Sequence, residues 1–311
     1  MYACSAAKSG LFAISQKYGL SISGSSCVGG DAVSLTSCWP IKVLSISADC
    51  LTSDSLAPKT IRNIHGVLSL ALKKGVPWKL ISRNPAIDVT LPKVERKDVK
   101  VLTKAKSADL LANCEGHWLH PVVFIALMTG MRRGEISALR WAEVNIDKRC
   151  LHVVASIEET KNGVRVKEVK TKHGRRQIDL PNIAVEFLKR HKAKETEKRF
   201  RLGLGRDDDA YVFTTEECRM RKPDTITSGF TKLAKKLDLG ITFHDLRHTH
   251  ISQLLADSHP ITTVSRRAGH AKVSITLDIY GHTMPDSQMT MMSEFGAAFE
   301  AAIEQAKNKT G

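Results

Sequence analysis

A tyrosine near the end of this 311-residue chain follows two motifs that are centred on arginine. Arg132 lies in TGMRRGEISALRW (129–141), Arg247 lies in HDLRH (244–248), and Tyr280 lies in GHAKVSITLDIYGH. Cleavage of a phosphodiester builds negative charge on the nonbridging oxygens. A planar guanidinium donates two hydrogen bonds to such oxygens and keeps its positive charge. The pattern therefore predicts two arginines that clamp a phosphate while a phenol attacks it.

A tyrosine nucleophile would form a covalent phosphodiester with the cut strand. This intermediate stores the energy of the broken bond, so that rejoining needs neither ATP nor a metal ion. A phenol has a pKa of about 10 in water, so Tyr280 needs cations and a base nearby. The leaving 5′-oxygen needs a proton donor, for which Lys170 and Lys172 on an expected strand turn are the candidates. Each residue alone is more often an ordinary surface or core residue, so the hypothesis depends on their combination.

Two histidines with helical spacing could instead bind a metal ion, which is the minor alternative to a role in phosphate chemistry. His244 and His248 stand four residues apart, as the metal-binding histidines of HExxH helices do. The glutamate of that motif is missing, because Asp245 takes its place, and His250 is the nearest third ligand. The seven cysteines are odd in number and include no CxxC pair. This argues against a disulfide framework and a zinc cluster, and we expect a protein of the reducing cytoplasm.

The charge of the chain favours a polyanionic partner. The net charge is +15 and the sequence pI is near 9.6, and nucleic acid is the commonest polyanion. Residues 1–55 hold three lysines and three aspartates, so the excess lies in residues 56–311. We expect no membrane anchor and no secretion signal, because long apolar runs are absent from the sequence.

The first part of the chain shows one clear helical pattern. Residues 1–55 look irregular or atypical, being rich in serine, glycine and cysteine. An amphipathic helix is expected from Pro58 to Gly75, followed by a short helix at 78–82. The charged segment 91–103 contains a proline and reads as a linker. The apolar positions of the longer helix are Ile61, Ile64, Leu68 and Leu72.

The remaining chain predicts a mainly α fold with a small antiparallel β-sheet, an α+β architecture. Helices begin near residue 104 and break at Thr129-Gly130. Alternating β-branched residues predict strands between 150 and 181, with hairpin turns at 160–163 and 172–174. Five further helices are expected at 183–200, 224–236, 244–256, 260–268 and 273–279. A last helix carries an apolar stripe of Phe295, Phe299 and Ile303.

Four segments together resemble the tyrosine recombinase (phage integrase) family, in particular the integrases of phages and Tn916-type conjugative transposons. The segments are TGMRRGEISALRW, VKTKHGRRQIDLP, FHDLRHTHISQLL and AGHAKVSITLDIYGH, and the likeness covers about residues 56–295. The resemblance implies a site-specific DNA recombinase that needs no cofactor. Such an enzyme cuts and rejoins strands through a 3′-phosphotyrosine and exchanges them through a Holliday junction, to integrate or excise a mobile element.

The resemblance also implies residue roles. Arg132 and Arg247 would be the catalytic arginines, and His270 would bind the scissile phosphate. Lys170 would protonate the leaving 5′-oxygen, with Lys172 as the alternative. Tyr280 would be the nucleophile. The complete set is Arg132, Lys170, His244, Arg247, His270 and Tyr280 as catalytic residues, with Glu135 and Lys172 in support.

The resemblance further implies double-stranded attachment-site DNA as the partner, a homotetramer on DNA, and an accessory excisionase or DNA-bending protein. We expect association with the nucleoid and no membrane partner. The stripe that begins at Phe295 would dock on a neighbouring protomer or pack on the chain's own core.

Two departures from the family pattern bear on function. Relatives carry an arm-binding domain and a complete core-binding domain, whereas only a partial helical core-binding domain (56–95) precedes the expected catalytic domain (96–311). A DNA-binding remnant without full recombination activity is therefore an alternative, and a type IB topoisomerase-like activity is another. Relatives also usually have glycine at Ser258 and leucine at Ala268. A large-to-small change in a core costs about 2–5 kcal/mol, so we expect Ala268 to weaken the fold.

Overall fold

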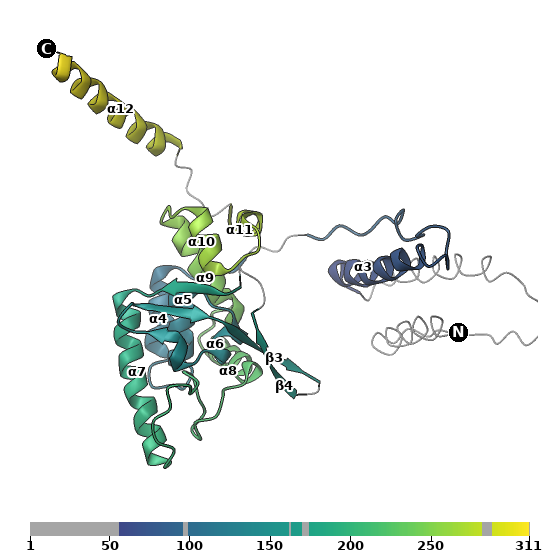
Figure 1. Cartoon of the computed structure of the whole chain (residues 1–311), viewed down its shortest axis with the longest axis horizontal. Coiled ribbons are helices and arrows are strands. Elements are labelled where there is room, and N and C mark those ends of the chain that lie inside the picture. The colour runs from purple at the N-terminus through teal and green to yellow at the C-terminus, as the bar shows by residue number, and fades with distance from the viewer. Residues whose placement is uncertain (1–55, 96–98, 162, 170–173, 282–287, 311) are drawn as a thin grey trace, which may run out of the picture. The chain divides into compact units, whose positions relative to one another are not determined.

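The computed structural model describes residues 56–95, 99–161, 163–169, 174–281 and 288–310, without the side chains of 288–291 and 306–310. The chain divides into two compact units, Met1–Arg96 and Lys97–Gly311 (Figure 1). The candidate residues all fall in the second unit.

The first unit contains the expected amphipathic helix, α3 (Pro58–Gly75). Proline occupies its first turn, where a missing N–H costs nothing. The short helix predicted at 78–82 is wrong, because this segment forms turns. The backbone N–H of Leu80 donates to the carbonyl oxygen of Gly75 at 3.0 Å, and Lys79 has a φ of 55°. A left-handed residue that closes such a hydrogen bond ends a helix and reverses the chain.

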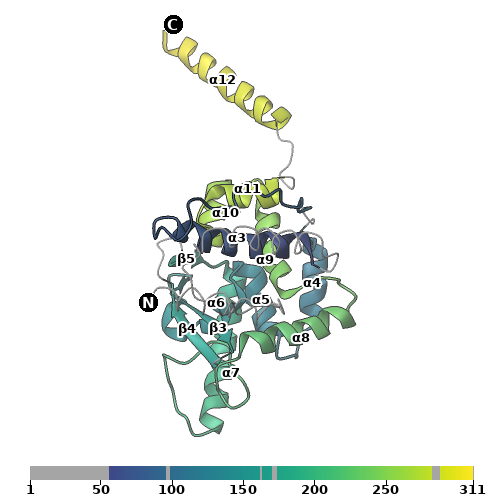
Figure 2. The same cartoon turned by 90° about the vertical axis from the view of Figure 1, so that its right-hand side faces the viewer.

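The second unit is built mainly from helices, as the sequence predicts. In chain order they are α4 (Lys104–Asn113), α5 (His120–Thr129), α6 (Arg133–Ala138), the 3₁₀ turn η1 (Trp141–Glu143), α7 (Asn182–Arg201), α8 (Pro223–Lys236), α9 (Phe243–Ala256), α10 (Ile261–Ala268), α11 (Val273–Tyr280) and α12 (Gln288–Thr310). Helix α5 is apolar on nearly every side because it lies in the middle of the core. It packs along α9, and α10 and α11 pack on α9 in turn (Figure 2). These contacts bring the predicted motifs into one region.

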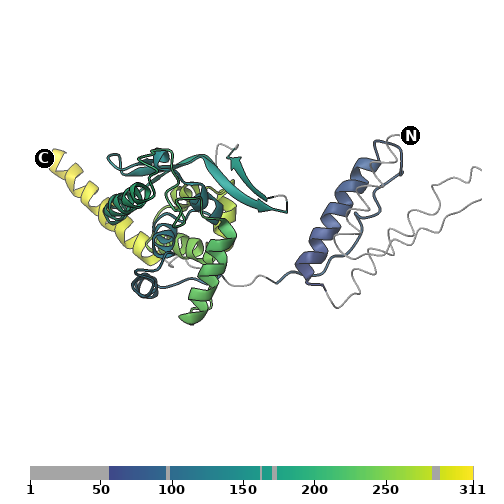
Figure 3. The same ribbon diagram turned by 90° about the horizontal axis from the view of Figure 1, so that it is seen from below.

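The strands form two small antiparallel sheets. β1 (Val144–Asn145), β2 (Cys150–Val153) and β5 (Arg176–Asp179) make one sheet in the order β1-β2-β5, and β3 (Ala155–Thr160) pairs with β4 (Gly163–Glu168) in the other. The hairpin predicted at 160–163 is confirmed, since Thr160 is the register partner of Gly163. This hairpin reaches away from the rest of the unit (Figure 3).

The second predicted hairpin is wrong, because β4 and β5 do not pair. Strand β5 pairs with β2, with Ile178 opposite Leu151. All six residues of β4 are exposed, whereas β5 alternates buried and exposed residues. A strand with a buried face pairs where that face meets the core, so β5 joins the sheet that covers the core. Residues 172 and 173 of the expected turn lie outside the described residues.

The end of the expected linker belongs to the second unit. Leu102 is buried, and its backbone N–H donates to the side-chain oxygen of Thr249 on α9 at 3.0 Å. The ammonium group of Lys100 donates to the carbonyl oxygen of Gly240 at 2.8 Å. These contacts tie residues 99–103 to α9 and to the turn that precedes it.

The apolar stripe of α12 is largely exposed. The relative exposures are 62% for Phe295, 60% for Phe299 and 44% for Ile303. In the part of the chain that the structure describes, no helix combines the length and the apolar character that crossing a membrane requires.

Candidate active site

A glycine positions the first arginine. Gly130 caps α5 with a φ of 64°, a conformation that other residues adopt only at a cost. A Cβ atom at this position would lie 2.6 Å from Cδ2 of His250. Glycine is therefore needed both for the turn and for the space. The turn directs the chain to Arg132, the residue that caps α6.

Glu135 holds Arg132 in place from one helical turn away. Its Oε2 accepts the backbone N–H of Arg132 at 2.9 Å, and its Oε1 accepts Nη1 of Arg132 at 2.9 Å. Nη2 of Arg132 donates to the carbonyl oxygen of Gly269 at 3.0 Å. The side chain of Glu135 is 4% exposed and that of Arg132 is 41% exposed. The guanidinium group thus stands on a buried support while remaining open to a ligand.

Arg176 is a further member of this cluster that our interpretation of the sequence missed. Its Nη2 lies 2.8 Å from Oε2 of Glu135, and its Nη1 lies 3.1 Å from Oε1. Its Nε donates to the carbonyl oxygen of Arg267 at 2.7 Å. Burial alone would raise the pKa of Glu135, but the hydrogen bonds and charge of Arg176, with those of Arg132, lower it. The signal was present in RQID, where alternation places Arg176 on the buried side with Ile178.

Arg247 is almost fully buried, with 3% exposure. Its Nη1 donates to the carbonyl oxygen of Gly130, and its Nη2 donates to that of Ala268, both at 2.6 Å. Burial, followed by the charge of Arg132, lowers the pKa of Arg247 to about 10, so the group stays protonated at neutral pH. Arg132 and Arg247 therefore donate to the adjacent carbonyls of Gly269 and Ala268.

The two predicted histidines flank the arginines. Burial and the charge of Arg247 lower the pKa of His244, which lies three residues earlier on α9. His270 follows the Gly269 cap of α10, and its Nδ1 lies 2.8 Å from Oγ1 of Thr276. Burial and the charges of Arg247 and Arg132 lower the pKa of His270 to about 4. His270 is therefore neutral at pH 7.

Tyr280 ends α11 and is only 1% exposed. Its phenolic oxygen forms a short hydrogen bond with Nδ1 of His248 on α9. The ring of His248 in turn meets the ring of His244 edge-on, with centroids 4.7 Å apart. Burial raises the pKa of Tyr280 to about 12. The phenol is consequently protonated in the free protein, and a neutral imidazole contacts it.

Both candidate lysines, Lys170 and Lys172, lie outside the described residues. The chain re-enters the described part at Gly174, whose carbonyl oxygen accepts Nη1 of Arg176 at 3.3 Å. The residue that follows the lysine segment is thus tied to the Glu135 cluster.

The described residues offer little to the metal alternative. None of them form a group of three or more side chains of the kind that binds metal ions. Both ring nitrogens of His250 are engaged by protein groups. Its Nδ1 lies 2.8 Å from the carbonyl oxygen of Leu127, and its Nε2 accepts Nε of Arg267 at 3.0 Å. His250 is therefore committed to the core and does not complete a site with His244 and His248.

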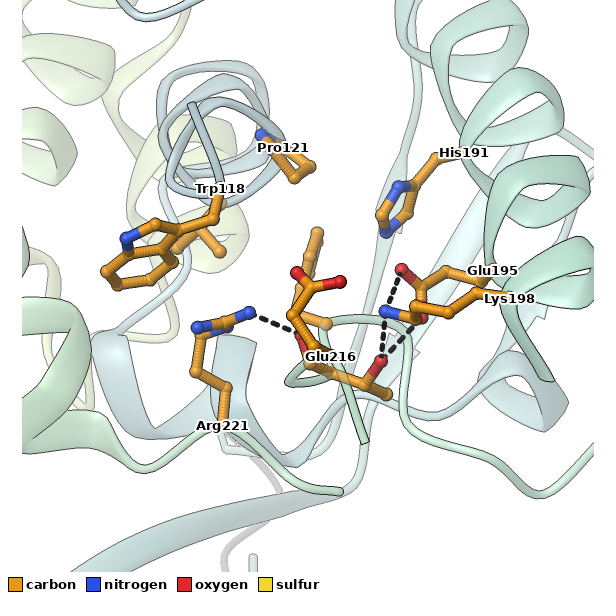
Figure 4. A pocket seen from close by; sticks show the side chains of 10 residues that line it. Trp118, Pro121, His191, Glu195, Lys198, Glu216 and Arg221 are labelled. Carbon is orange, nitrogen blue, oxygen red and sulfur yellow. Dashed lines mark hydrogen bonds and ion pairs between the residues drawn. The ribbon is translucent and has the colours of Figure 1, made fainter. Parts of the chain in front are cut away.

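A separate cavity of about 100 Å³ lies between α7, the start of α5 and the segment 213–221 (Figure 4). Three of its charged groups, Glu195, Lys198 and Arg221, are engaged by neighbouring protein groups. The ammonium group of Lys198 donates to Oε1 of Glu195 at 2.8 Å, and the guanidinium of Arg221 stacks 4.2 Å above the ring of Trp118. Its wall contains none of the candidate residues: it consists of Trp118, Pro121, Val122, His191, Glu195, Lys198, Phe213, Thr214, Glu216 and Arg221.

Two curated relatives span most of this chain. The ICEBs1 integrase of Bacillus subtilis is 28% identical over 244 residues, which cover 78% of this chain and 66% of the relative. A tyrosine recombinase XerC-like protein of Caldanaerobacter subterraneus is 25% identical over 261 residues, with the same coverages. The chain therefore spans just under two thirds of the length of these relatives.

Solved structures share the fold. The integrase of transposon Tn1549, bound to transposon right-end DNA, superposes with a TM-score of 0.72 at 18% identity and covers 95% of this chain and 94% of its own. A lambda integrase dimer bound to a COC' core site gives a TM-score of 0.58 at 16% identity, with 90% and 88% covered. Residues 95–286 match the sequence profile of the Phage integrase family. Because that match takes in more than half of the chain, this protein belongs to the phage integrase family.

Proposed function

We propose that this chain is a tyrosine site-specific recombinase that cleaves and rejoins DNA strands to integrate or excise a mobile element. The observation that carries the proposal is the meeting of Arg132 and Arg247 at the adjacent carbonyls of Gly269 and Ala268. Two guanidinium groups that converge from α6 and α9 make a clamp for one phosphate. Tyr280 lies beside α9, in contact with His248, so the nucleophile belongs to the same cluster.

In the proposed reaction the phenolic oxygen of Tyr280 attacks the scissile phosphorus. The bond to the 5′-oxygen breaks, and the strand remains attached through its 3′-phosphate. Lys170 or Lys172 protonates the leaving oxygen. Arg132, whose side chain is partly exposed, and the buried Arg247 stabilise the charge on the nonbridging oxygens. Attack by a 5′-hydroxyl from another strand reverses these steps and completes the exchange.

We propose double-stranded attachment-site DNA as the substrate and a homotetramer as the active assembly, with an excisionase or a DNA-bending protein as an accessory. The Tn1549 and lambda integrases were solved on DNA, and the whole excess positive charge of this chain lies after residue 55. The exposed stripe of Phe295, Phe299 and Ile303 on α12 supports docking on a neighbouring protomer. Such an enzyme would be nucleoid-associated.

We further propose that residues 56–95 serve as a partial core-binding domain and residues 96–311 as the catalytic domain. The main alternative is a truncated DNA-binding remnant that binds DNA without full recombination activity. Paired attachment sites separate the two, because recombinant product excludes a remnant. Relaxation of a plasmid that carries no attachment site would instead favour a topoisomerase-like activity.

The direct test is trapping of the covalent intermediate on a nicked suicide substrate. The wild-type chain should form a DNA adduct that survives denaturation, and Tyr280→Phe should form none. Tyr211→Phe is the matched control, because Tyr211 contacts Arg140 outside the cluster and should leave adduct formation intact. An adduct in Tyr280→Phe would refute the assignment of the nucleophile.

A further inference from the structure

His248 contacts Tyr280 but has no role yet in the proposed cleavage reaction. Its Nδ1 is hydrogen-bonded to the phenolic oxygen of Tyr280, the atom that attacks phosphorus in the proposed reaction. We propose that His248 is a catalytic residue, the general base that takes the proton of Tyr280 as the phenol attacks the phosphate. This inference rests on the proposed function and adds a proton acceptor to it.

The two elements that meet at this contact fix its geometry. His248 lies one helical turn after His244 on α9, so both rings emerge from one face. Tyr280 closes α11, which packs on α9, and the two ring centroids are 5.6 Å apart. The neutral imidazole that carries its proton on Nε2 presents a lone pair at Nδ1. With that tautomer the phenol donates to Nδ1, which is the arrangement that proton transfer requires.

Burial and the neighbouring charges keep His248 in its neutral form. Burial, followed by the charge of His244, lowers the pKa of His248 to about 4, with Arg247 acting in the same direction and Asp245 opposing it. His270, beyond α10, is also electrostatically coupled to this ring. His248 is therefore neutral at pH 7 and leaves its acceptor atom free of a proton.

DNA binding would reduce the difference between the pKa of Tyr280 and the pKa of His248. In the free protein the pKa of Tyr280 is about 12 and that of His248 is about 4, so the proton stays on the phenol. A phosphodiester held by Arg247 adds a negative charge and offsets the cation that lowers the pKa of His248. The base becomes stronger when substrate is present, and proton transfer accompanies attack on phosphorus. Burial, which raises the pKa of Tyr280, thus keeps the phenol protonated without DNA.

The O–H bond of Tyr280 breaks, its proton moves to Nδ1 of His248, and the phenolic oxygen forms its bond to phosphorus. The bond from phosphorus to the 5′-oxygen breaks, and that oxygen takes a proton from the general acid, for which Lys170 and Lys172 are the candidates. During rejoining the imidazolium of His248 returns its proton to the departing phenolate.

The test compares single-turnover adduct formation across pH for the wild-type chain and His248→Gln. The amide of glutamine can accept a hydrogen bond from the phenol but does not take its proton. His259→Gln is the matched control, because His259 is exposed after the end of α9. We expect His248→Gln to slow adduct formation near neutral pH on the order of 100-fold or more. Its rate should climb with pH as hydroxide replaces the base, whereas the wild-type rate should be flat.

Two results would overturn the inference. One is adduct formation at the wild-type rate in His248→Gln. The other is a reduction of this rate by the same factor at every pH, which indicates a structural role for His248. If the wild-type chain itself forms no adduct, the proposed function fails instead. A second measurement needs no change at position 248. Difluorotyrosine, a more acidic phenol, is placed at position 280. With His248 as the base the cleavage rate should change little, and a rate that rises in proportion to the acidity of the phenol would show that no base acts.

Discussion

Replacing Arg176 by methionine is the sharpest test of how the arginine cluster is held. Methionine keeps a long unbranched side chain but removes the charge and every hydrogen bond of the guanidinium. Those bonds reach both carboxylate oxygens of Glu135 and the carbonyl oxygens of Arg267 and Gly174. The side chains of Arg176 and Glu135 are each 4% exposed, so water does not replace the lost partner.

The expected loss of unfolding free energy is about 3–5 kcal/mol, the usual cost of removing one member of a buried ion pair. The lower half of that range is favoured, because Glu135 keeps its two hydrogen bonds to Arg132. Charge-assisted hydrogen bonds contribute about 1.5–3 kcal/mol each, but the four contacts of Arg176 share one side chain and do not add.

Urea unfolding at neutral pH measures this loss, and Arg175→Met is the matched control. Arg175 is the neighbouring arginine, with a 61% exposed side chain and a loose 3.7 Å ion pair to Glu168. Its replacement should change the unfolding free energy by about 0.5 kcal/mol or less. Each single variant leaves the charge of the other residue buried without this partner, whereas the double variant removes both charges. The double variant should therefore lose less unfolding free energy than the sum of the two single losses.

Acid gives an independent check on the same pair. The folded protein lowers the pKa of Glu135 below its usual value of 4.5. The stabilisation is therefore complete above about pH 4.5 and is lost as the pH falls through the folded-state pKa. The difference between the wild-type chain and Arg176→Met should shrink over that range. A loss under about 1 kcal/mol at neutral pH, or additive single and double variants, would refute the reasoning.

Three further predictions concern stability, each measured by urea unfolding. Gly130→Ala should cost about 1–3 kcal/mol more than Gly203→Ala, because both glycines have positive φ but only the first meets His250; equal losses would contradict this. Ser258→Gly should stabilise the chain by about 0.5–1 kcal/mol, since Ser258 has a φ of 61°, and a loss would be the contrary result. Burial and the charge of Arg267 lower the pKa of His250 from 6.5 to about 3. The unfolded state therefore takes up the proton first, and the unfolding free energy should fall as the pH drops from 6.5 towards 3. At about pH 5 the loss due to His250 should be about 2 kcal/mol, and this pH-dependent loss should be absent in His250→Gln.

Periodicity was sufficient to predict most helices, because each one buries a face that repeats along the chain. The break after α5 was also predictable, since Thr129-Gly130 interrupts an apolar run. The pairing of the strands could not be predicted, because the sequence of β5 does not indicate which strand lies beside it. The pairing of β5 with β2 depends on which strand has a buried face to match.

Most of the candidate residues could be named from motif spacing, but their supports could not. A basic residue in a strand usually points to solvent, so Arg176 does not stand out in the sequence. The alternation of RQID places it on the buried side with Ile178, and its contact with Glu135 gives its role. His248 was considered only as a metal ligand, since spacing along α9 does not show that α11 brings Tyr280 against it. Ser258 has a φ of 61°, a left-handed conformation that glycine adopts without cost, which fits the glycine that the family resemblance predicts at this position.

Main-chain oxygens help to hold the two arginines of the proposed clamp, at Gly130 and Ala268 for Arg247 and, beside the carboxylate of Glu135, at Gly269 for Arg132. A carbonyl group is present whatever side chain its residue carries. The side chain at a position such as Ala268 can therefore change while the hydrogen bond to Arg247 is kept. The same arrangement makes Arg247 a poor choice for an inactive variant, because its removal would also loosen the ends of α5 and α10. Loss of activity in such a variant would not separate chemistry from folding, whereas Tyr280→Phe deletes a single oxygen.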